Sequence, residues 1–210
     1  MRILLVNDDG IACQGILALV RALKHEHQLT VIAPASERSG FSHSLSIHNT
    51  ISVTKTTIPG HEDVEAYAIS GTPADCTKLG VRTLCKERPD LVISGINFGN
   101  NLGTDTSYSG TCAGALEAAL LGLPGIAVSQ HHKEGEEDRV EFDTGARFIA
   151  GILGDIAKWD WPEGCILNVN IPDLWNSKVE GVAVCPLSGL HYEESYDLVE
   201  QTGENVFVYK

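Results

Sequence analysis

The chain has 210 residues, 43% of them hydrophobic, and its 28 acidic and 15 basic residues give a formal net charge of −13 at pH 7. This length and composition suit one domain with a substantial core. The acidic excess opposes binding to polyphosphate backbones, so duplex nucleic acid is not an expected partner, although a small phosphorylated ligand is compatible where a cation neutralises its site.

The amino terminus and the cysteines both favour an intracellular setting. The sequence enters an apolar run directly, without a basic segment and signal-type core, and contains no apolar run long enough to span a bilayer. The six cysteines show no Cys-x-x-Cys spacing, which argues against a zinc knuckle. We therefore expect a cytoplasmic protein with reduced thiols and no membrane partner.

A pair of carboxylates follows the first predicted strand. Ile3 to Val6 forms an apolar run that leads into Asn7-Asp8-Asp9-Gly10, and residues 12–25 then show helical spacing of apolar side chains. Loops at the carboxyl ends of strands bind ligands in open α/β sheets. Because a hard cation stabilises two adjacent carboxylates, Asp8 and Asp9 are predicted to form a metal site. The alternative for this stretch is a solvated turn that caps the first helix.

The second predicted strand, Leu29 to Ala33, completes a strand-helix-strand unit, which favours a parallel sheet with right-handed crossovers. The polar segment 35–46 then leaves the sheet on the same edge as the two aspartates, so Ser39 is a further candidate for the site. His43 could act as a general acid, but a lone histidine in a loop is more often a surface hydrogen-bonding group.

Residues 47–70 are predicted to form a hairpin inserted between two halves of the sheet. Ile47 to Val53 alternates in polarity, Pro59-Gly60 supplies a turn, and Val64 to Ile69 is a second extended run. The next residues, Gly71-Thr72-Pro73-Ala74-Asp75, predict a helix start with a capping box and a proline at the first helical position.

Amides and hydroxyls follow the next predicted strand, Asp90 to Ser94. Residues 95–103 form a predicted loop of three glycines and three asparagines, whose backbone can adopt positive φ and whose side chains supply neutral ligands. The helix after it begins at Ser109-Gly110-Thr111. Backbone N–H groups, two hydroxyls and the positive end of the helix dipole make this start suitable for a phosphate, although alone it would be an ordinary helix cap.

The rest of the chain completes the predicted sheet and adds a tail. The remaining predicted elements are a strand at Gly125 to Ser129, a helix over about 143–158, and strands at Cys165 to Ile171 and Val179 to Cys185. The charged segment 131–141 is predicted to be a solvated loop rather than a metal site at His131-His132. Residues 186–210 lack a core-forming pattern and are predicted to be an extended arm that reaches over a neighbouring subunit.

Oxygen donors therefore gather at one edge of a mostly parallel sheet in a predicted α/β fold. An all-oxygen ligand set selects Mg²⁺, Mn²⁺ or Ca²⁺ over zinc. A hard cation beside a phosphate site implies phosphoryl chemistry, in which the metal polarises a phosphoryl oxygen and presents a water as the nucleophile.

Six segments together resemble the SurE family of metal-dependent nucleotidases. In chain order they are Asn7-Asp8-Asp9-Gly10, Glu37-Arg38-Ser39, Gly71-Thr72-Pro73-Ala74-Asp75-Cys76, Ser94-Gly95-Ile96-Asn97, Gly99-Asn100-Asn101-Leu102-Gly103 and Tyr108-Ser109-Gly110-Thr111. The resemblance spans roughly residues 1–185. It implies a Rossmann-like three-layer α/β sandwich, and hydrolysis of nucleoside 5′- and 3′-monophosphates, in some members also of short-chain polyphosphate.

The resemblance also implies roles for individual residues. By position, the family's ligands to one divalent ion, Mg²⁺ or Mn²⁺, fall on Asp8, Asp9, Ser39 and Asn97. Its phosphate contacts fall on Asn101, Ser109, Gly110 and Thr111. We expect Asp8 or Asp9 to orient the attacking water or take its proton, without a covalent phosphoenzyme. The family assembles as homodimers or homotetramers through its hairpin and carboxyl-terminal arm, and its members usually continue beyond the position of Lys210.

Three other classes share part of this pattern. A receiver-like signalling domain that binds Mg²⁺ without turnover is the main alternative, but its phosphate-accepting aspartate would stand where this chain has Ser94. A haloacid-dehalogenase-like phosphatase needs two aspartates separated by one residue, whereas Asp8 and Asp9 are adjacent. A dinucleotide-binding fold would have Gly-x-Gly-x-x-Gly after the first strand, and this chain lacks it there.

Overall fold

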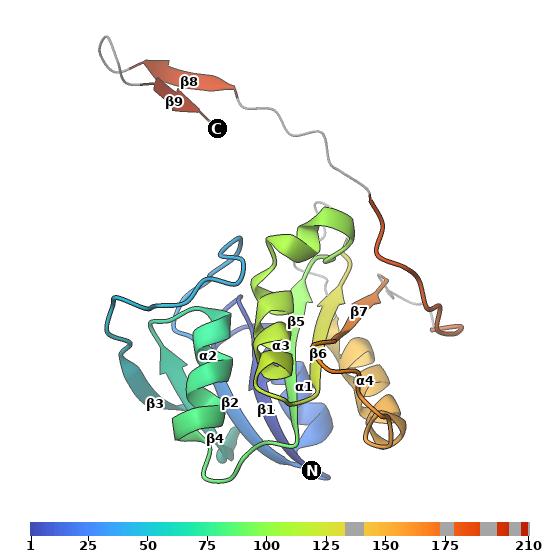
Figure 1. The fold of residues 1–210 in the computed structure, drawn as a ribbon. Helices are drawn as coiled ribbons and strands as arrows, with labels where there is room; N and C mark the ends of the chain where they lie inside the picture. The colour runs from blue at the N-terminus through green and yellow to red at the C-terminus, as the bar shows by residue number, and fades with distance from the viewer. Residues whose placement is uncertain (133–140, 173–178, 190–196, 202–206, 210) are drawn as a thin grey trace.

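The computed structural model describes residues 1–132, 141–172, 179–189, 197–201 and 207–209 (Figure 1). Its central feature is a seven-stranded sheet with helices on both faces. The elements of this body are β1 (Arg2–Val6), α1 (Gln14–Leu23), β2 (Gln28–Pro34), β3 (Val53–Ile58), β4 (His61–Ile69), α2 (Pro73–Leu79), β5 (Leu91–Phe98), α3 (Gly110–Leu120), β6 (Gly125–Gln130), α4 (Phe142–Ile156) and β7 (Leu167–Ile171). A π-helical turn, Gly80–Leu84, follows α2, and a short 3₁₀ helix, Gly103–Ser107, precedes α3.

The strand order places the two halves of the sheet on either side of β1. The order is β3-β4-β2-β1-β5-β6-β7, and β1 pairs in parallel with both β2 and β5. The chain therefore builds outward through β2 and β4, then crosses to the other side of β1 with β5. In open α/β sheets the ligand crevice lies at the carboxyl ends of the strands where the order reverses. This topology singles out the segments that follow β1 and β5.

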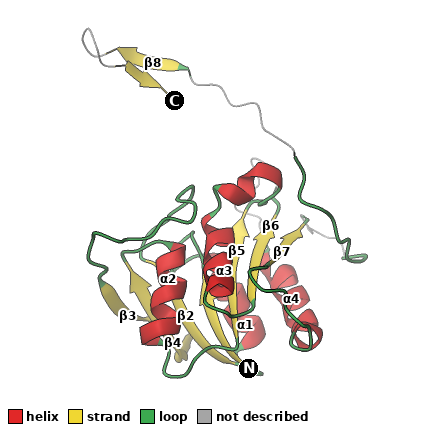
Figure 2. Ribbon diagram, viewed as in Figure 1, coloured by secondary structure: helices red, strands yellow, loops and turns green. Residues whose placement is uncertain are grey.

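Helices cover both faces of the sheet, as Figure 2 shows. Helices α1 and α4 pack on the face to which β1 contributes Ile3 and Leu5, and α2 and α3 pack on the face to which it contributes Leu4 and Val6. Because successive side chains of a strand point to opposite faces, a strand buried on both sides has to be apolar throughout. The predicted α/β fold with a mostly parallel sheet is confirmed.

The hairpin differs in extent and in position from the prediction. Its first strand begins at Val53 rather than Ile47, and residues 47–52 form no strand. The hairpin does not separate two halves of the sheet, because β4 pairs in parallel with β2 and β3 pairs with β4, so that both strands extend one edge. Strand β4 pairs with β2, and the local sequence does not show with which strand β4 will pair.

The strand predicted at Val179 to Cys185 is wrong. Residues 179–189 form no strand, and Val184 is 98% exposed. An apolar run becomes a strand only where a neighbour completes its ladder, and in the described sheet β7 pairs with β6 and with no further strand. Within the predicted arm, β8 (Leu198–Gln201) and β9 (Phe207–Tyr209) form a separate antiparallel sheet.

Parts of two other predictions lie outside the described residues. They are residues 133–140 of the charged segment, and residues 190–196, 202–206 and 210 of the arm. No helix in the described part of the chain is long and apolar enough to cross a membrane.

The cysteines give a first test of the fold. All six are free thiols, of which Cys165 and Cys185 are exposed. Burial raises the pKa of each of the other four, Cys13 (to about 12), Cys76, Cys85 and Cys112. Because the thiolate is the reactive form, iodoacetamide near neutral pH is expected to modify Cys165 and Cys185 in the native protein and the others only after unfolding. Peptide mass spectrometry measures this, and rapid native labelling of Cys13 would contradict the fold around it.

Candidate functional site

A tight turn after β1 presents the two aspartates. The side-chain Nδ2 of Asn7 donates to the carbonyl of Gly10 at 2.8 Å, and the N–H of Gly10 donates back to Asn7 Oδ1 at 3.2 Å. Gly10 has a φ of +102°, a conformation that favours glycine. Since Asn7 is fully buried, these local hydrogen bonds hold the turn from inside and orient Asp8 and Asp9 as they leave the strand.

Asp8 lies against the start of helix α3. It is 4% exposed, and the hydroxyl of Thr111 donates to its Oδ1 at 2.5 Å. A Cβ atom added to Gly110 would lie 2.9 Å from Asp8 Oδ2, so glycine is required for this close approach. Burial raises the pKa of Asp8, and the hydrogen bond from Thr111 opposes that rise. Burial thus disfavours the charged form of Asp8, and this carboxylate lies at the positive end of helix α3.

Asp9 contacts the end of β5. The backbone N–H of Phe98 donates to its carboxylate and favours the charged form, but burial and the neighbouring charge of Asp8 outweigh this and raise the pKa of Asp9 to about 7. Glu37 raises the pKa further as a smaller cause. Desolvation and mutual repulsion disfavour the charged forms of the two carboxylates, and a bound cation would stabilise those charged forms. The electrostatics thus fit a hard cation at Asp8 and Asp9.

Ser39 lies on a loop that contacts the same turn. The N–H of its neighbour Arg38 donates to the backbone carbonyl of Asp8 at 2.7 Å, which fixes the loop beside the aspartates. Ser39 itself is exposed, and its Oγ donates to Glu37 Oε1 at 2.7 Å. The structure therefore brings the Ser39 loop to the aspartate pair.

Asn97 belongs to β5 and not to a loop. The prediction that the strand ends at Ser94 is wrong, because β5 continues to Phe98. The pairing with β6 shifts register at Gly95-Ile96 and resumes at Asn97, and such a bulge accounts for a glycine inside a strand. The Nδ2 of Asn97 donates to the carbonyl of Gly99 at 2.9 Å, so Oδ1 is the atom left to face a cation.

The start of α3 combines a helix cap with backbone N–H groups that have no helical partner. Ser109 is the N-cap, and its Oγ accepts from the N–H of Cys112 at 3.0 Å. The first N–H groups of a helix lack helical partners and suit an anion. The hydroxyl of Thr111, expected to contact phosphate, is directed at Asp8 instead. Of the predicted phosphate contacts, Ser109, Gly110 and Thr111 therefore lie together beside Asp8.

Asn101 is held by other elements. It is 7% exposed, and its Nδ2 donates to Ser129 Oγ at 2.7 Å. Its backbone N–H donates to Asn170 Oδ1, and its carbonyl accepts from the side chains of Asn168 and Asn170. Among the described residues, the hydrogen bonds of Asn101 thus run to β6 and β7 and not to the aspartates or α3. It anchors the amide-rich loop to the sheet.

The donor set is made of oxygen atoms. In the described part of the chain, no three His, Cys, Asp or Glu side chains gather closely enough to hold a metal ion. An ion at this edge would therefore draw on hydroxyl and amide oxygens as well as the two carboxylates. That combination, from Asp8, Asp9, Ser39 and Asn97, suits Mg²⁺ or Mn²⁺ better than zinc.

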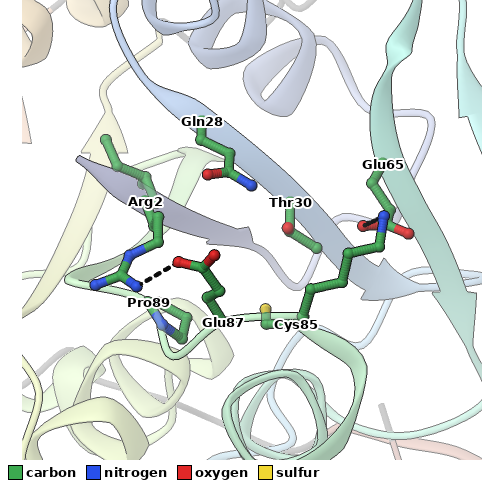
Figure 3. A pocket seen from close by; sticks show the side chains of 9 residues that line it. Arg2, Gln28, Thr30, Glu65, Cys85, Glu87 and Pro89 are labelled. Atoms are coloured by element: carbon green, nitrogen blue, oxygen red, sulfur yellow. Dashed lines mark hydrogen bonds and ion pairs between the residues drawn. The ribbon is translucent and has the colours of Figure 1, made fainter.

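A surface hollow lies at the amino ends of the strands, away from the carboxyl ends where the aspartates lie (Figure 3). Arg2 begins β1 and Gln28 begins β2, so both mark the amino ends of the strands. Arg2 forms an ion pair with Glu87 at 2.7 Å within this hollow. No residue predicted for the site lines it.

Three contributors to this region were not predicted. They are the carboxylate of Glu37, the N–H of Phe98, and Glu117, whose Oε2 lies 2.9 Å from His43 Nε2. Glu37 stood in the quoted segment Glu37-Arg38-Ser39 but was given no role, and Glu117 is the one charged residue among the small and apolar residues of 110–120. His43, considered as a general acid, faces Glu117 in the structure.

Known proteins are similar to this chain over most of its length. A family model described as "Survival protein SurE" matches residues 3–194. A 5′-nucleotidase SurE of Clostridium beijerinckii is 42% identical over 205 residues, which cover 97% of this chain and 79% of the relative. Another of the same name, from Thermosipho melanesiensis, is 42% identical over 197 residues, 94% of this chain and 75% of the relative. The crystal structure of a SurE protein from Aquifex aeolicus superimposes with a TM-score of 0.81 at 38% identity, over 95% of this chain and 77% of that one.

Proposed function

The chain belongs to the SurE family, and on this basis we propose that it hydrolyses nucleoside 5′-monophosphates to nucleoside and phosphate. Relatives at about 40% identity over most of the chain bear the name 5′-nucleotidase. The observation that carries the proposal is the contact between Asp8 and the start of α3: a buried carboxylate, next to the half-buried Asp9 in sequence, lies beside a helix terminus suited to phosphate.

We propose that Asp8, Asp9, Ser39 and Asn97 hold one divalent cation, Mg²⁺ or Mn²⁺. When bound, such an ion neutralises the two carboxylates, polarises a phosphoryl oxygen and lowers the pKa of a water. The four side chains lie on the turn after β1, on the loop after β2 and at the end of β5. Those segments converge where the strand order reverses.

The other residues bind and orient the substrate. In this proposal the N–H groups of Gly110 and Thr111 and the dipole of α3 hold the phosphate oxygens. The Asp8–Thr111 hydrogen bond fixes the carboxylate relative to that helix. The aspartate pair orients the attacking water or takes its proton. Strand β5, Leu91–Phe98, contains no aspartate that could accept a phosphoryl group as in a receiver-type domain, so hydrolysis without a covalent intermediate is favoured over a signalling role.

Three finer properties belong to the same proposal. The site would accept nucleoside 3′-monophosphates and short polyphosphate as well, because the groups assigned to it contact the phosphate and not the base. The protein would act in the cytoplasm. It would assemble as a homodimer or homotetramer through the β3–β4 hairpin and the arm that carries β8 and β9.

A panel of 5′- and 3′-nucleotides tests the function directly. Phosphate release from 5′-nucleotides is expected in the presence of Mn²⁺ or Mg²⁺, loss of that activity after EDTA treatment, and recovery when the ion is restored. Activity that survives exhaustive chelation would overturn the metal dependence alone. Absence of hydrolysis with every nucleotide and ion would overturn the function, and a stable acyl-phosphate adduct would point instead to the receiver or dehalogenase class.

A further inference from the structure

A buried carboxylate on α3 connects three parts of the molecule. Glu117 is 2% exposed, its Oε2 lies 2.9 Å from His43 Nε2, and its Oε1 lies 3.0 Å from Lys78 Nζ. His43 belongs to the loop after β2, and Lys78 belongs to α2. A charge in the interior is tolerated only where partners compensate for its lost hydration, so both contacts of Glu117 hold elements to α3.

The loop that His43 anchors is the one that carries Ser39. Its backbone is fastened before Ser39, where Arg38 donates to Asp8, and after it, where the Ser42 N–H donates to the carbonyl of Tyr108 at 3.0 Å. Between these points Gly40 has a φ of +73° and open space around it, so the tip itself has little packing. The position of Ser39 therefore depends on the two fastened ends, and His43 lies next to the second of them.

Glu117 lies too far along α3 to contact a phosphate at its start. It stands seven positions after Gly110, which corresponds to about 10 Å along the helix axis. It shares a rigid helix with Ser109, Gly110 and Thr111, while it holds the Ser39 loop through His43. Glu117 thus joins the proposed metal side of the site to the proposed phosphate side, in addition to the Ser42–Tyr108 and Thr111–Asp8 hydrogen bonds.

We propose that Glu117 is a positioning residue: it fixes the Ser39 loop, through His43, relative to helix α3 and thereby sets the affinity of the site for its cation. This inference rests on the proposed metal-dependent function. It assigns no chemical step to Glu117 or His43. Lys78 compensates the buried charge from α2 and does not belong to the loop, so the two arms of the contact can be separated by mutation.

Equilibrium Mn²⁺ binding, measured by electron paramagnetic resonance of the free ion, tests the proposal without relying on turnover. Glu117→Gln and His43→Ala are each expected to weaken Mn²⁺ binding about 10- to 100-fold, the usual effect of removing a group that orients a metal ligand. Lys78→Gln, the matched control, is expected to stay within about threefold of the wild type because the His43 contact remains. His43→Gln, which can still donate to Glu117, should recover most of the affinity.

Several outcomes would overturn the inference. They are unchanged Mn²⁺ affinity in folded His43→Ala, or equal losses in Lys78→Gln and His43→Ala. If Glu117→Gln fails to fold, the partly exposed His43 still decides the question through its two variants. Wild-type protein that binds Mn²⁺ but releases no phosphate would refute the proposed function while leaving this comparison valid, whereas protein that binds no Mn²⁺ would refute the inference as well.

Discussion

Asp8→Asn and Asp9→Asn are each expected to lower kcat/KM for nucleoside 5′-monophosphates by about a thousandfold or more, because each removes a charge placed to stabilise the transition state. Both carboxylates lie at the point where the strand order reverses, and each contacts a different element of the site, α3 for Asp8 and the end of β5 for Asp9. Steady-state assays at saturating Mn²⁺ measure the effect.

In the absence of metal, Asp9→Asn is expected to be at least as stable as the wild type, although its activity falls. The folded-state pKa of Asp9 lies at about 7, above the ordinary value of 3.8, so the folded protein binds more protons than the unfolded chain between these values. Stability contributed by this group is present at low pH and falls as the pH rises through that window. Asp9→Asn removes the penalty, and its melting temperature in EDTA at pH 8 should equal or exceed that of the wild type.

A matched control separates the expected loss of kcat/KM in the two site variants from the effect of losing any one negative charge. Asp63→Asn removes one carboxylate from an exposed position on β4, paired with Lys24 at 3.0 Å, and should leave kcat/KM within about twofold, since exposed ion pairs contribute little. Near-wild-type hydrolysis by either site variant would show that the aspartate pair is not the centre of the reaction.

Gly15→Ala is expected to destabilise the fold by about 3 kcal/mol or more. Gly15 lies in the first turn of α1, and a Cβ atom there would stand 1.9 Å from the carbonyl oxygen of Ile96. Backbone atoms on both sides of the contact leave no flexible side chain that could give way. The helix must move off β5, and the residue after Ile96 is Asn97, so activity should fall together with stability.

Thermal unfolding followed by circular dichroism measures this change. For a chain of this size, the expected loss corresponds to a fall in melting temperature of roughly 6 to 12 °C. Gly151→Ala is the matched control: it makes the same substitution in α4, where an added Cβ meets nothing within 4 Å, and should be neutral or raise stability by up to about 1 kcal/mol. Equal melting temperatures for the two variants would contradict the close packing of α1 on β5.

The sequence by itself determined the features that depend on neighbours along the chain. The apolar run of β1 and the helix start at Thr72, where Asp75 completes the predicted capping box, follow from short-range patterns and formed as expected. The cap at Ser109 did likewise. The same short-range reasoning found the Asp8-Asp9 pair and placed it at the carboxyl end of a strand. These contacts form within a few residues, so the sequence that encodes them is contiguous.

Only the tertiary structure decided which distant segments meet. It placed the hairpin at one edge of the sheet, extended β5 through Asn97, and left Val179 to Cys185 without a strand partner. It also directed Thr111 to Asp8 and paired His43 with Glu117, across separations of 103 and 74 residues. Such contacts depend on strand order and on how closely helices approach the sheet, and no short stretch of the chain encodes either of these.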